Sequence, residues 1–304
     1  MACPHLERCS GCPAMHLAYP EQLSRKLERL RLGFASYPEL ASVAITSVEP
    51  AEPSLAYRTR VKWMIGAEGE LGLFARGGGH RVVDIPGCVV VDPAILEVGR
   101  TLRHLLTTDG PARRLRAVDI RVARSSGAPA RLLLTLVSER LALQHGEALD
   151  LAQQIARRCP AVAGIAWTET RPGAVQVLGP RPAPLVGRGA VPDDVGSATV
   201  TATFGAFVQA HRGQAARVEG ALLDAARALG PAPRVLELFS GSGAFAMALA
   251  ATGAEVDAVE SHVPAAAELE RRGANGIRSH AADAEAFTEA AAQGGRSWDL
   301  VVVD

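Results

Sequence analysis

Hydrophobic residues in the N-terminal part of the chain recur at spacings that predict three helices. At residues 19–37 the apolar positions follow a three- and four-residue period, and Pro20 stands where the first helical turn accepts a proline. Residues 93–106 and 141–158 are predicted as two further helices. An amphipathic helix needs a surface for its apolar face, which the segments between these helices should supply.

Strand patterns fill those intervening segments. Apolar and polar side chains alternate along residues 57–91, and glycine-containing turns divide this stretch into short strands. Residues 115–124 and 131–138 predict the two arms of a hairpin. Residues 172–198 are rich in glycine and proline, which indicates a connecting strand and linker.

From about residue 213 short apolar strands alternate with helices. The predicted helices are 214–229, 245–251 and 263–275, and the predicted strands are 234–239, 256–259 and 299–303. This alternation is typical of the opening of a doubly wound α/β sheet. We therefore predict an N-terminal α+β domain at residues 1–200 and an incomplete Rossmann-like domain at residues 201–304.

Length and composition fit two domains without a membrane segment. The chain has 304 residues, of which 48% are hydrophobic, enough for two separate cores. No run approaches the roughly 18 apolar residues that span a bilayer. Residues 1–5 lack the apolar core of a signal peptide. We therefore expect a soluble, cytoplasmic protein.

Charge is balanced overall but unevenly distributed. Residues 1–200 carry 24 basic and 19 acidic side chains, whereas residues 201–304 carry 8 and 13. All but two of the basic residues are arginines, which suit bidentate contacts with phosphate. Codon bias explains this preference equally well, and an excess of five positive charges over 200 residues is only a weak nucleic-acid signal.

Four of the five cysteines have the spacing of metal ligands. Cys3, Cys9 and Cys12 form a C-x5-C-x2-C run, and Cys88 stands apart. Thiolates are soft donors that select iron–sulfur clusters or zinc, and a reducing cytosol argues against disulfides. Iron–sulfur and structural zinc both remain open on spacing alone. Cys159 lies among apolar residues, so we interpret it as a buried structural thiol.

The second part carries a candidate nucleotide site. The glycine-rich turn at residues 240–244 (SGSGA) follows an apolar strand, and Glu260 ends the next strand 21 residues past Phe239. An acidic residue at that position binds ribose hydroxyls. A nicotinamide site would favour a third glycine, which is missing here, so S-adenosylmethionine is the favoured ligand. The alternative is an ordinary Rossmann-like turn with a solvated glutamate.

Taken together, these features give the chain a resemblance to a known enzyme family. It resembles the iron–sulfur RNA (uracil-5-)-methyltransferases, which make 5-methyluridine in 23S rRNA or tRNA, and in particular the shorter branch without an N-terminal OB-like domain. The matching segments are the four cysteines, residues 57–60 (YRTR), 207–209 (FVQ), 236–245 (LELFSGSGAF) and 299–304 (DLVVVD).

The resemblance implies two cofactors and their ligands. A 4Fe–4S cluster would be held by Cys3, Cys9, Cys12 and Cys88. S-adenosylmethionine would be bound by Gln209, Phe239, Gly241, Gly243, Glu260 and Asp304. The partner would be RNA, with 23S rRNA favoured and tRNA the alternative. The protein would be a cytoplasmic monomer, and its second domain would be a methyltransferase domain of Rossmann-like fold.

The resemblance also implies covalent catalysis, in which a cysteine thiolate adds to uracil C6 before C5 attacks the cofactor methyl group. The expected nucleophilic cysteine and glutamate base lie beyond residue 304 in the family pattern. We therefore expect this chain alone to be inactive. Arg58, Arg60 and Lys62 are candidate phosphate contacts, with a solvated strand edge as the alternative.

Three other functions fit parts of the pattern. A non-catalytic iron–sulfur protein could bind RNA without methylating it. A zinc-stapled Rossmann domain could use the same cysteines. A radical S-adenosylmethionine enzyme is disfavoured, because it would use C-x3-C-x2-C and leave one iron open, whereas here the spacing differs and a fourth cysteine is present.

Overall fold

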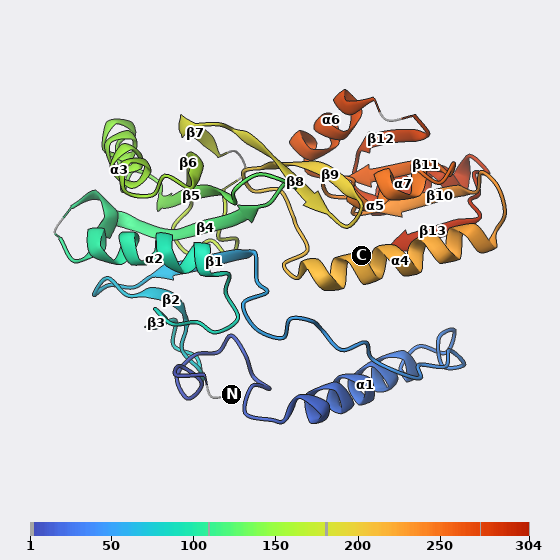
Figure 1. Ribbon diagram of the computed structural model, residues 1–304, viewed down its shortest axis with the longest axis horizontal. Helices are drawn as coiled ribbons and strands as arrows, with labels where there is room; N and C mark the ends of the chain where they lie inside the picture. Colours follow the sequence, from blue (N-terminus) through green and yellow to red (C-terminus); the bar gives the residue numbers. More distant parts are fainter. Residues whose placement is uncertain (1–2, 109, 180–181, 274, 304) are drawn as a thin grey trace.

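A seven-stranded sheet and a four-stranded sheet organise the computed structural model (Figure 1). The structure describes residues 3–108, 110–179, 182–273 and 275–303. In spatial order, the strands of the larger sheet are β3 (Val82–Asp84), β2 (Leu71–Phe74), β1 (Arg60–Ile65), β4 (Leu115–Ala123), β5 (Arg131–Glu139), β6 (Val162–Thr170) and β7 (Ala183–Gly187). Its neighbours are antiparallel except β5 and β6.

Two helices cover one face of this sheet. α2 (Pro93–Leu106) packs there beside α3 (His145–Arg158), and α3 makes the crossover that joins the parallel strands β5 and β6. The short 3-10 helix η1 (Pro111–Arg114) leads from α2 towards β4. Trp63, Leu134 and Ile155 are among the fully buried side chains of the core between sheet and helices.

The smaller sheet is wholly parallel and is covered on both faces. Its order is β12 (Ile277–Ala281), β11 (Glu255–Glu260), β10 (Arg234–Leu238) and β13 (Leu300–Val303). Its helices are α4 (Arg212–Ala228), α5 (Ala244–Ala250), α6 (Val263–Arg272) and α7 (Ala284–Gln293). Side chains from α4, α5 and α6 share one core with Val235 and Val256, whereas α7 covers the opposite face around Leu236. This is the predicted doubly wound arrangement.

A two-stranded hairpin connects the sheets. β8 (Ala190–Val195) contacts β4 of the larger sheet, and β9 (Ala198–Thr203) contacts α5 of the smaller one. The carboxylate of Asp193 is fully buried and accepts hydrogen bonds from Arg121 on β4, at 2.8 Å, and from Arg212 at the start of α4. One buried aspartate therefore ties the larger sheet, the hairpin and α4 together.

The helix α1 (Tyr19–Ala35) lies apart from both sheets in Figure 1 and has no buried residue. It begins with a proline in its first turn, as the sequence predicts. None of the described helices is both long enough and apolar enough to cross a bilayer.

Several predicted elements are confirmed and others are corrected. The helix at residues 93–106 and the hairpin of β4 and β5 are confirmed. The predicted start of a helix at residue 141 is wrong: Leu141 adopts a left-handed backbone, and a capping box between Gln144 and Glu147 starts α3 at His145. The predicted boundary at residue 200 falls within β9, and the division into domains stays a prediction.

The sequence patterns missed β6, β9, β12 and the helix α7. Residues 172–198, predicted as one connecting strand and a linker, contain the two strands β7 and β8. Pro184 is tolerated in β7 because this strand lies at the edge of its sheet, where a missing N–H breaks no ladder. β12 carries no buried residue, so its sequence lacks the apolar run of a central strand.

A buried carboxylate fastens the smaller sheet to the segment that follows α7. Asp257 on β11 is only 4% exposed and accepts hydrogen bonds of 2.8 Å from each of His280, Arg296 and Trp298. Burial raises the pKa of Asp257, but these three hydrogen bonds outweigh it and hold the pKa below the ordinary aspartate value. A carboxylate with a depressed pKa stabilises the fold above its unfolded pKa and loses that effect as pH falls.

We expect Asp257→Asn to lower the free energy of unfolding at pH 7 by about 2–3 kcal/mol, because the amide keeps one acceptor and presents an N–H to donors. The deficit should begin to shrink as pH falls below about 3.9, because Asp257 of the unfolded wild-type chain takes up a proton there, whereas the folded carboxylate is protonated only at lower pH. Urea unfolding of both proteins from pH 7 to pH 3 measures this. Glu255→Gln should change little, because Glu255, on the same strand as Asp257, forms only an exposed pair with Arg278 of β12. A deficit independent of pH would contradict the assignment.

Candidate functional site

The loop between β10 and α5 turns through an unusual run of left-handed residues. Phe239, Gly241 and Gly243 have φ values of 60°, 58° and 76°. Glycine adopts this conformation freely, but for Phe239 it costs about 1–2 kcal/mol. The Phe239 side chain is nevertheless 52% exposed at the carboxyl end of the sheet, so core packing does not explain why it is held there.

The two glycines of this loop have different structural roles. A Cβ on Gly243 would lie 2.6 Å from Leu269 of α6, so this glycine allows the loop to pack closely on that helix. A Cβ on Gly241 would meet nothing nearer than Phe207, at 4.0 Å. Gly241 therefore faces the open side of the loop, where its backbone can be approached by a ligand.

Glu260 lies beside the same loop, as its position at the end of β11 predicts. One carboxylate oxygen accepts a 2.8 Å hydrogen bond from the Gly241 amide, and the other accepts a 2.6 Å bond from the His262 amide. The oxygen that bonds the His262 amide also accepts a 3.4 Å hydrogen bond from the Ser261 hydroxyl. The oxygen that bonds the Gly241 amide keeps a further lone pair, which can accept a bond from a hydroxyl group of a ligand.

A small cavity of about 30 Å³ opens over the glycine-rich loop. Its lining includes Phe207, Gln209, Phe239, Ser240 and Gly241. The Ser240 hydroxyl is buried and has no hydrogen-bond partner among the described residues. The cavity itself has room for only a few water molecules. The open glycine backbone, the unsatisfied hydroxyl and the adjacent carboxylate are groups that can hydrogen-bond an adenosyl cofactor lying against the outer side of the loop.

The structure thus brings together most of the residues predicted for the cofactor. Gln209, Phe239 and Gly241 line one cavity, and Glu260 joins them through its bond to Gly241. Gly243 supports the loop from the side of α6, as described above. Asp304, also predicted to bind the cofactor, lies outside the described residues.

The sequence patterns did not single out three other residues of this cavity. Phe207 belongs to the matched FVQ segment, so the prediction for Gln209, two residues later, could have been extended to Phe207. Glu237 is a buried acid within an apolar strand, which could have marked it. Ser240 gave no signal beyond its place in the glycine-rich turn.

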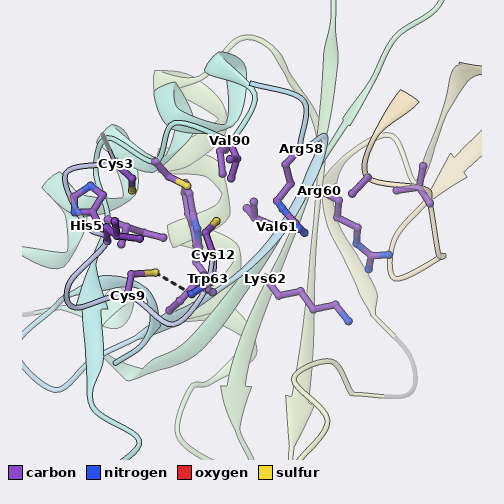
Figure 2. A pocket seen from close by; sticks show the side chains of 18 of the residues that line it. Cys3, His5, Cys9, Cys12, Arg58, Arg60, Val61, Lys62, Trp63 and Val90 are labelled. Atoms are coloured by element: carbon purple, nitrogen blue, oxygen red, sulfur yellow. Dashed lines mark hydrogen bonds between the residues drawn. The ribbon is translucent and has the colours of Figure 1, made fainter. Parts of the chain in front are cut away.

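The four cysteines outside the core surround a second, larger cavity (Figure 2). Cys3, Cys9, Cys12 and Cys88 all line this space of about 430 Å³. The N-terminal loop reaches it by pairing with the end of β2, where the Ser10 amide donates to the Phe74 carbonyl at 3.2 Å. Cys88 arrives from the turn after β3.

Electrostatics show that these thiols influence one another. Burial raises the pKa of Cys12, and the neighbouring Cys88, Cys9 and Cys3 raise it further. Burial also raises the pKa of Cys88, with Cys3 adding to the effect and the Val90 amide opposing it. A bound cation would favour the thiolate forms that this environment disfavours.

Within the described part of the chain, no group of three or more cysteine, histidine, aspartate or glutamate side chains is placed to hold a metal ion. The donor chemistry and the shared cavity fit a thiolate-bound group, and the identity of that group stays a prediction. Cys159 is 5% exposed and its thiol donates to the Thr101 hydroxyl at 3.2 Å. Its interpretation as a buried structural thiol is confirmed.

The basic residues of the YRTR segment differ in their surroundings. Arg58 and Arg60 lie at the opposite end of the larger cavity from His5 and Cys3 (Figure 2). The Arg60 side chain is only 10% exposed and forms a double hydrogen bond with Asp119. The prediction that Arg60 contacts phosphate is therefore wrong, because its donors already serve protein acceptors.

Lys62 remains accessible on the strand that carries Arg60. Partial burial lowers the pKa of its ammonium group, the Arg60 charge lowers it further, and Asp119 opposes both effects. The prediction that Arg58 and Lys62 contact phosphate stays a prediction.

Comparison with known proteins places these features in a family context. The chain is 24% identical over 319 residues to an uncharacterised RNA methyltransferase of Geobacter sulfurreducens, covering all of this chain and 63% of that protein. It is 30% identical over 296 residues to a 23S rRNA (uracil(1939)-C(5))-methyltransferase of Halomonas elongata, covering 92% of this chain and 56% of that protein. No family model matches the chain.

These relatives confirm the resemblance to RNA methyltransferases inferred from the sequence motifs. The chain spans about 63% of the Geobacter protein and 56% of the Halomonas protein. A solved tRNA (uracil-54, C5)-methyltransferase from Pyrococcus abyssi, in complex with S-adenosyl-L-homocysteine, has a TM-score of 0.64 and 19% identity, covering 91% of this chain and 65% of that one. This likeness confirms the mixed α/β, methyltransferase-like fold.

The two glycines should respond differently to alanine. We expect Gly243→Ala to lower the free energy of unfolding by about 2–4 kcal/mol, because the strained φ adds to a clash with Leu269. Gly241→Ala should cost only the backbone strain, about 1–2 kcal/mol. Urea unfolding measures both. The matched control for backbone strain alone is Gly253→Ala, because Gly253 is also left-handed and has open space around its Cβ position. Equal losses for Gly243→Ala and Gly241→Ala would show that Leu269 does not restrict the loop.

Proposed function

We propose that this chain carries the RNA-binding and cofactor-binding parts of an S-adenosylmethionine-dependent enzyme that methylates uridine C5 in 23S rRNA. The observation that carries the proposal is the 30% identity over 296 residues to the Halomonas enzyme, whose name states that reaction. The arrangement around the glycine-rich loop supports it independently, because it gathers the groups that an adenosyl cofactor needs. We further propose that the protein is a cytoplasmic monomer.

S-adenosylmethionine would supply an electrophilic methyl group on its sulfonium. Glu260 would accept hydrogen bonds from the ribose hydroxyls while its bonds to the Gly241 and His262 amides keep it in place. Phe239 and Gln209 would border the cofactor from two sides of the cavity. Gly243 would hold the loop against α6, and Asp304 is proposed as a further cofactor ligand.

Methylation at C5 also requires a nucleophile for C6 of the base. The chain has five cysteines, and none is proposed for this role. Four of them surround the larger cavity, and the fifth, Cys159, is buried in the core of the larger sheet. The nucleophile and the base that removes the C5 proton are therefore proposed to come from residues that this chain does not contain.

For the larger cavity we propose a 4Fe–4S cluster bound by Cys3, Cys9, Cys12 and Cys88. Support comes from four soft donors on one cavity. The effects of these thiols on one another's pKa values show that they lie close together. The cluster would order the N-terminal loop against β2 and the turn after β3. Structural zinc is the competing ligand.

The function is tested by methyl transfer from labelled S-adenosylmethionine to unmodified 23S rRNA and unmodified tRNA. We expect this chain to bind the cofactor without turnover, and a version extended to the length of the relatives to label uridine C5 in 23S rRNA. In the extended enzyme, Glu260→Ala should raise the KM for S-adenosylmethionine by about tenfold or more, because it removes a charged hydrogen-bond acceptor.

Labelling of tRNA alone would move the substrate assignment from rRNA to tRNA. RNA binding without methylation by either version would overturn the enzyme proposal and leave a non-catalytic RNA-binding protein.

The cluster is tested by metal analysis after anaerobic purification. We expect about four irons and about four acid-labile sulfides per chain, with a brown colour. Cys12→Ser and Cys88→Ser should each lose most of the iron. Cys159→Ser, a cysteine substitution in the core of the larger sheet, should keep it. Stoichiometric zinc in protein purified from iron-supplemented cells would contradict the proposal.

A further inference from the structure

Two segments that are far apart in the sequence are joined beside the proposed cofactor site. The Arg60 guanidinium donates to the Ala206 carbonyl at 2.6 Å and to the Gly205 carbonyl at 3.2 Å. One residue before it, Thr59 donates to the Ala210 carbonyl from its amide, at 3.0 Å, and from its hydroxyl, at 3.2 Å. Residues 59 and 60 thus hold both ends of the segment 205–210 by hydrogen bonds to its backbone carbonyls.

Arg60 is itself fixed in one orientation. Its Nε donates to one oxygen of Asp119 at 2.9 Å, and its Nη2 donates to the other at 3.0 Å. The two side chains are 10% and 4% exposed. A guanidinium held by a bidentate carboxylate presents its remaining N–H groups in fixed directions. The hydrogen bonds from these groups therefore hold the carbonyls of Gly205 and Ala206 in fixed positions.

The gripped segment carries residues of both cavities. Phe207 and Gln209 line the cavity over the glycine-rich loop, and Phe207 lies next to the open side of Gly241. Phe207 and Val208 also line the cavity of the four cysteines. Residues 205–210 therefore form a wall that the two cavities share, and we call them the wall segment. A small displacement of this segment would change the shape of both cavities.

A second set of contacts holds the segment's continuation. The rings of Tyr57 and His211 are stacked with centroids 4.6 Å apart. His211 accepts a hydrogen bond from the Gln214 amide through Nδ1, at 3.2 Å, and so caps the start of α4. Residues 57–60 therefore hold both ends of the segment and the residue that follows it, which an RNA-phosphate role for Arg60 would not require.

We propose that Arg60 is a positioning residue for the cofactor site, acting through the carbonyls of Gly205 and Ala206 to set the places of Phe207 and Gln209. This inference rests on the proposed function, because it takes the cavity over the glycine-rich loop as the site of the adenosyl cofactor. The role is one of placement: Arg60 itself lies behind the segment and does not line that cavity.

The test compares Arg60→Gln, Arg60→Lys and a matched control in this 304-residue chain. Arg103→Gln is the control, because Arg103 likewise donates to a carboxylate, Asp84, and to a backbone carbonyl, that of Leu71, but does not touch the wall segment. Two quantities are measured: the Kd for S-adenosyl-L-homocysteine by calorimetry, and amide hydrogen exchange of residues 204–210 by mass spectrometry. Thermal melting reports the loss of stability in each variant.

We expect Arg60→Gln to raise the Kd by about tenfold or more and to speed exchange in residues 204–210. Arg60→Lys should lie between it and the wild type, because an ammonium can pair with Asp119 but cannot bond both oxygens and the carbonyls together. Arg103→Gln should lower the melting temperature while leaving the Kd within about twofold, since its partners lie elsewhere.

Three outcomes would overturn the inference. Faster exchange with an unchanged Kd would show that Arg60 holds the segment without serving the site. A Kd that rises equally in Arg60→Gln and Arg103→Gln would show a general loss of stability. An unchanged exchange rate in Arg60→Gln would show that the segment is held by other contacts. Failure of the wild-type chain to bind S-adenosyl-L-homocysteine would instead contradict the cofactor proposal, and with it any placement role at that site.

Discussion

The buried carboxylate of Asp193 is the constraint on which the relative placement of the two sheets depends. It has no exposure to water, so its charge must be met by Arg121 from one side and Arg212 from the other. Removing one partner of such a pair leaves an uncompensated buried charge, at a typical cost of about 3–5 kcal/mol. Because the three residues come from β4, β8 and the start of α4, their geometry fixes where the smaller sheet begins.

The chain path between β9 and α4 follows from that constraint. The residues between them pass the start of β1, where Thr59 and Arg60 donate hydrogen bonds to their backbone carbonyls. This is where the wall segment lies, with the cysteine cavity on one side and the glycine-rich loop on the other. The two cavities thus share Phe207 and Val208, so the two proposed cofactors would occupy neighbouring spaces although their ligands would come from opposite ends of the sequence.

How far the sequence predicted this arrangement depends on the range of the interactions involved. The helix at 93–106, the hairpin of β4 and β5, the buried Cys159 and the place of Glu260 all follow from local periodicity or from one strand–turn–helix unit. Motif spacing also grouped the four cysteines that share a cavity. These are features in which neighbouring residues carry the information.

Other features depend on distant partners and could not be predicted. Arg60 was interpreted as a phosphate contact because its neighbours are basic, whereas its acceptors lie 59 residues away, at Asp119, and 146 residues away, at Ala206. The edge strand β7 and the exposed strand β12 have sequences that resemble loops, since neither needs an apolar run. Tertiary context overrode local propensity in each case.

Phe239 shows where stability and function compete in this fold. Its backbone conformation suits glycine, and a chain selected only for ease of folding would place glycine there. Instead a large aromatic ring is held half exposed, beside a loop whose other turns do use glycine. In the proposed cofactor site this part of the surface would therefore be shaped before any ligand binds, and the strain would be borne by the folded state rather than by the binding step.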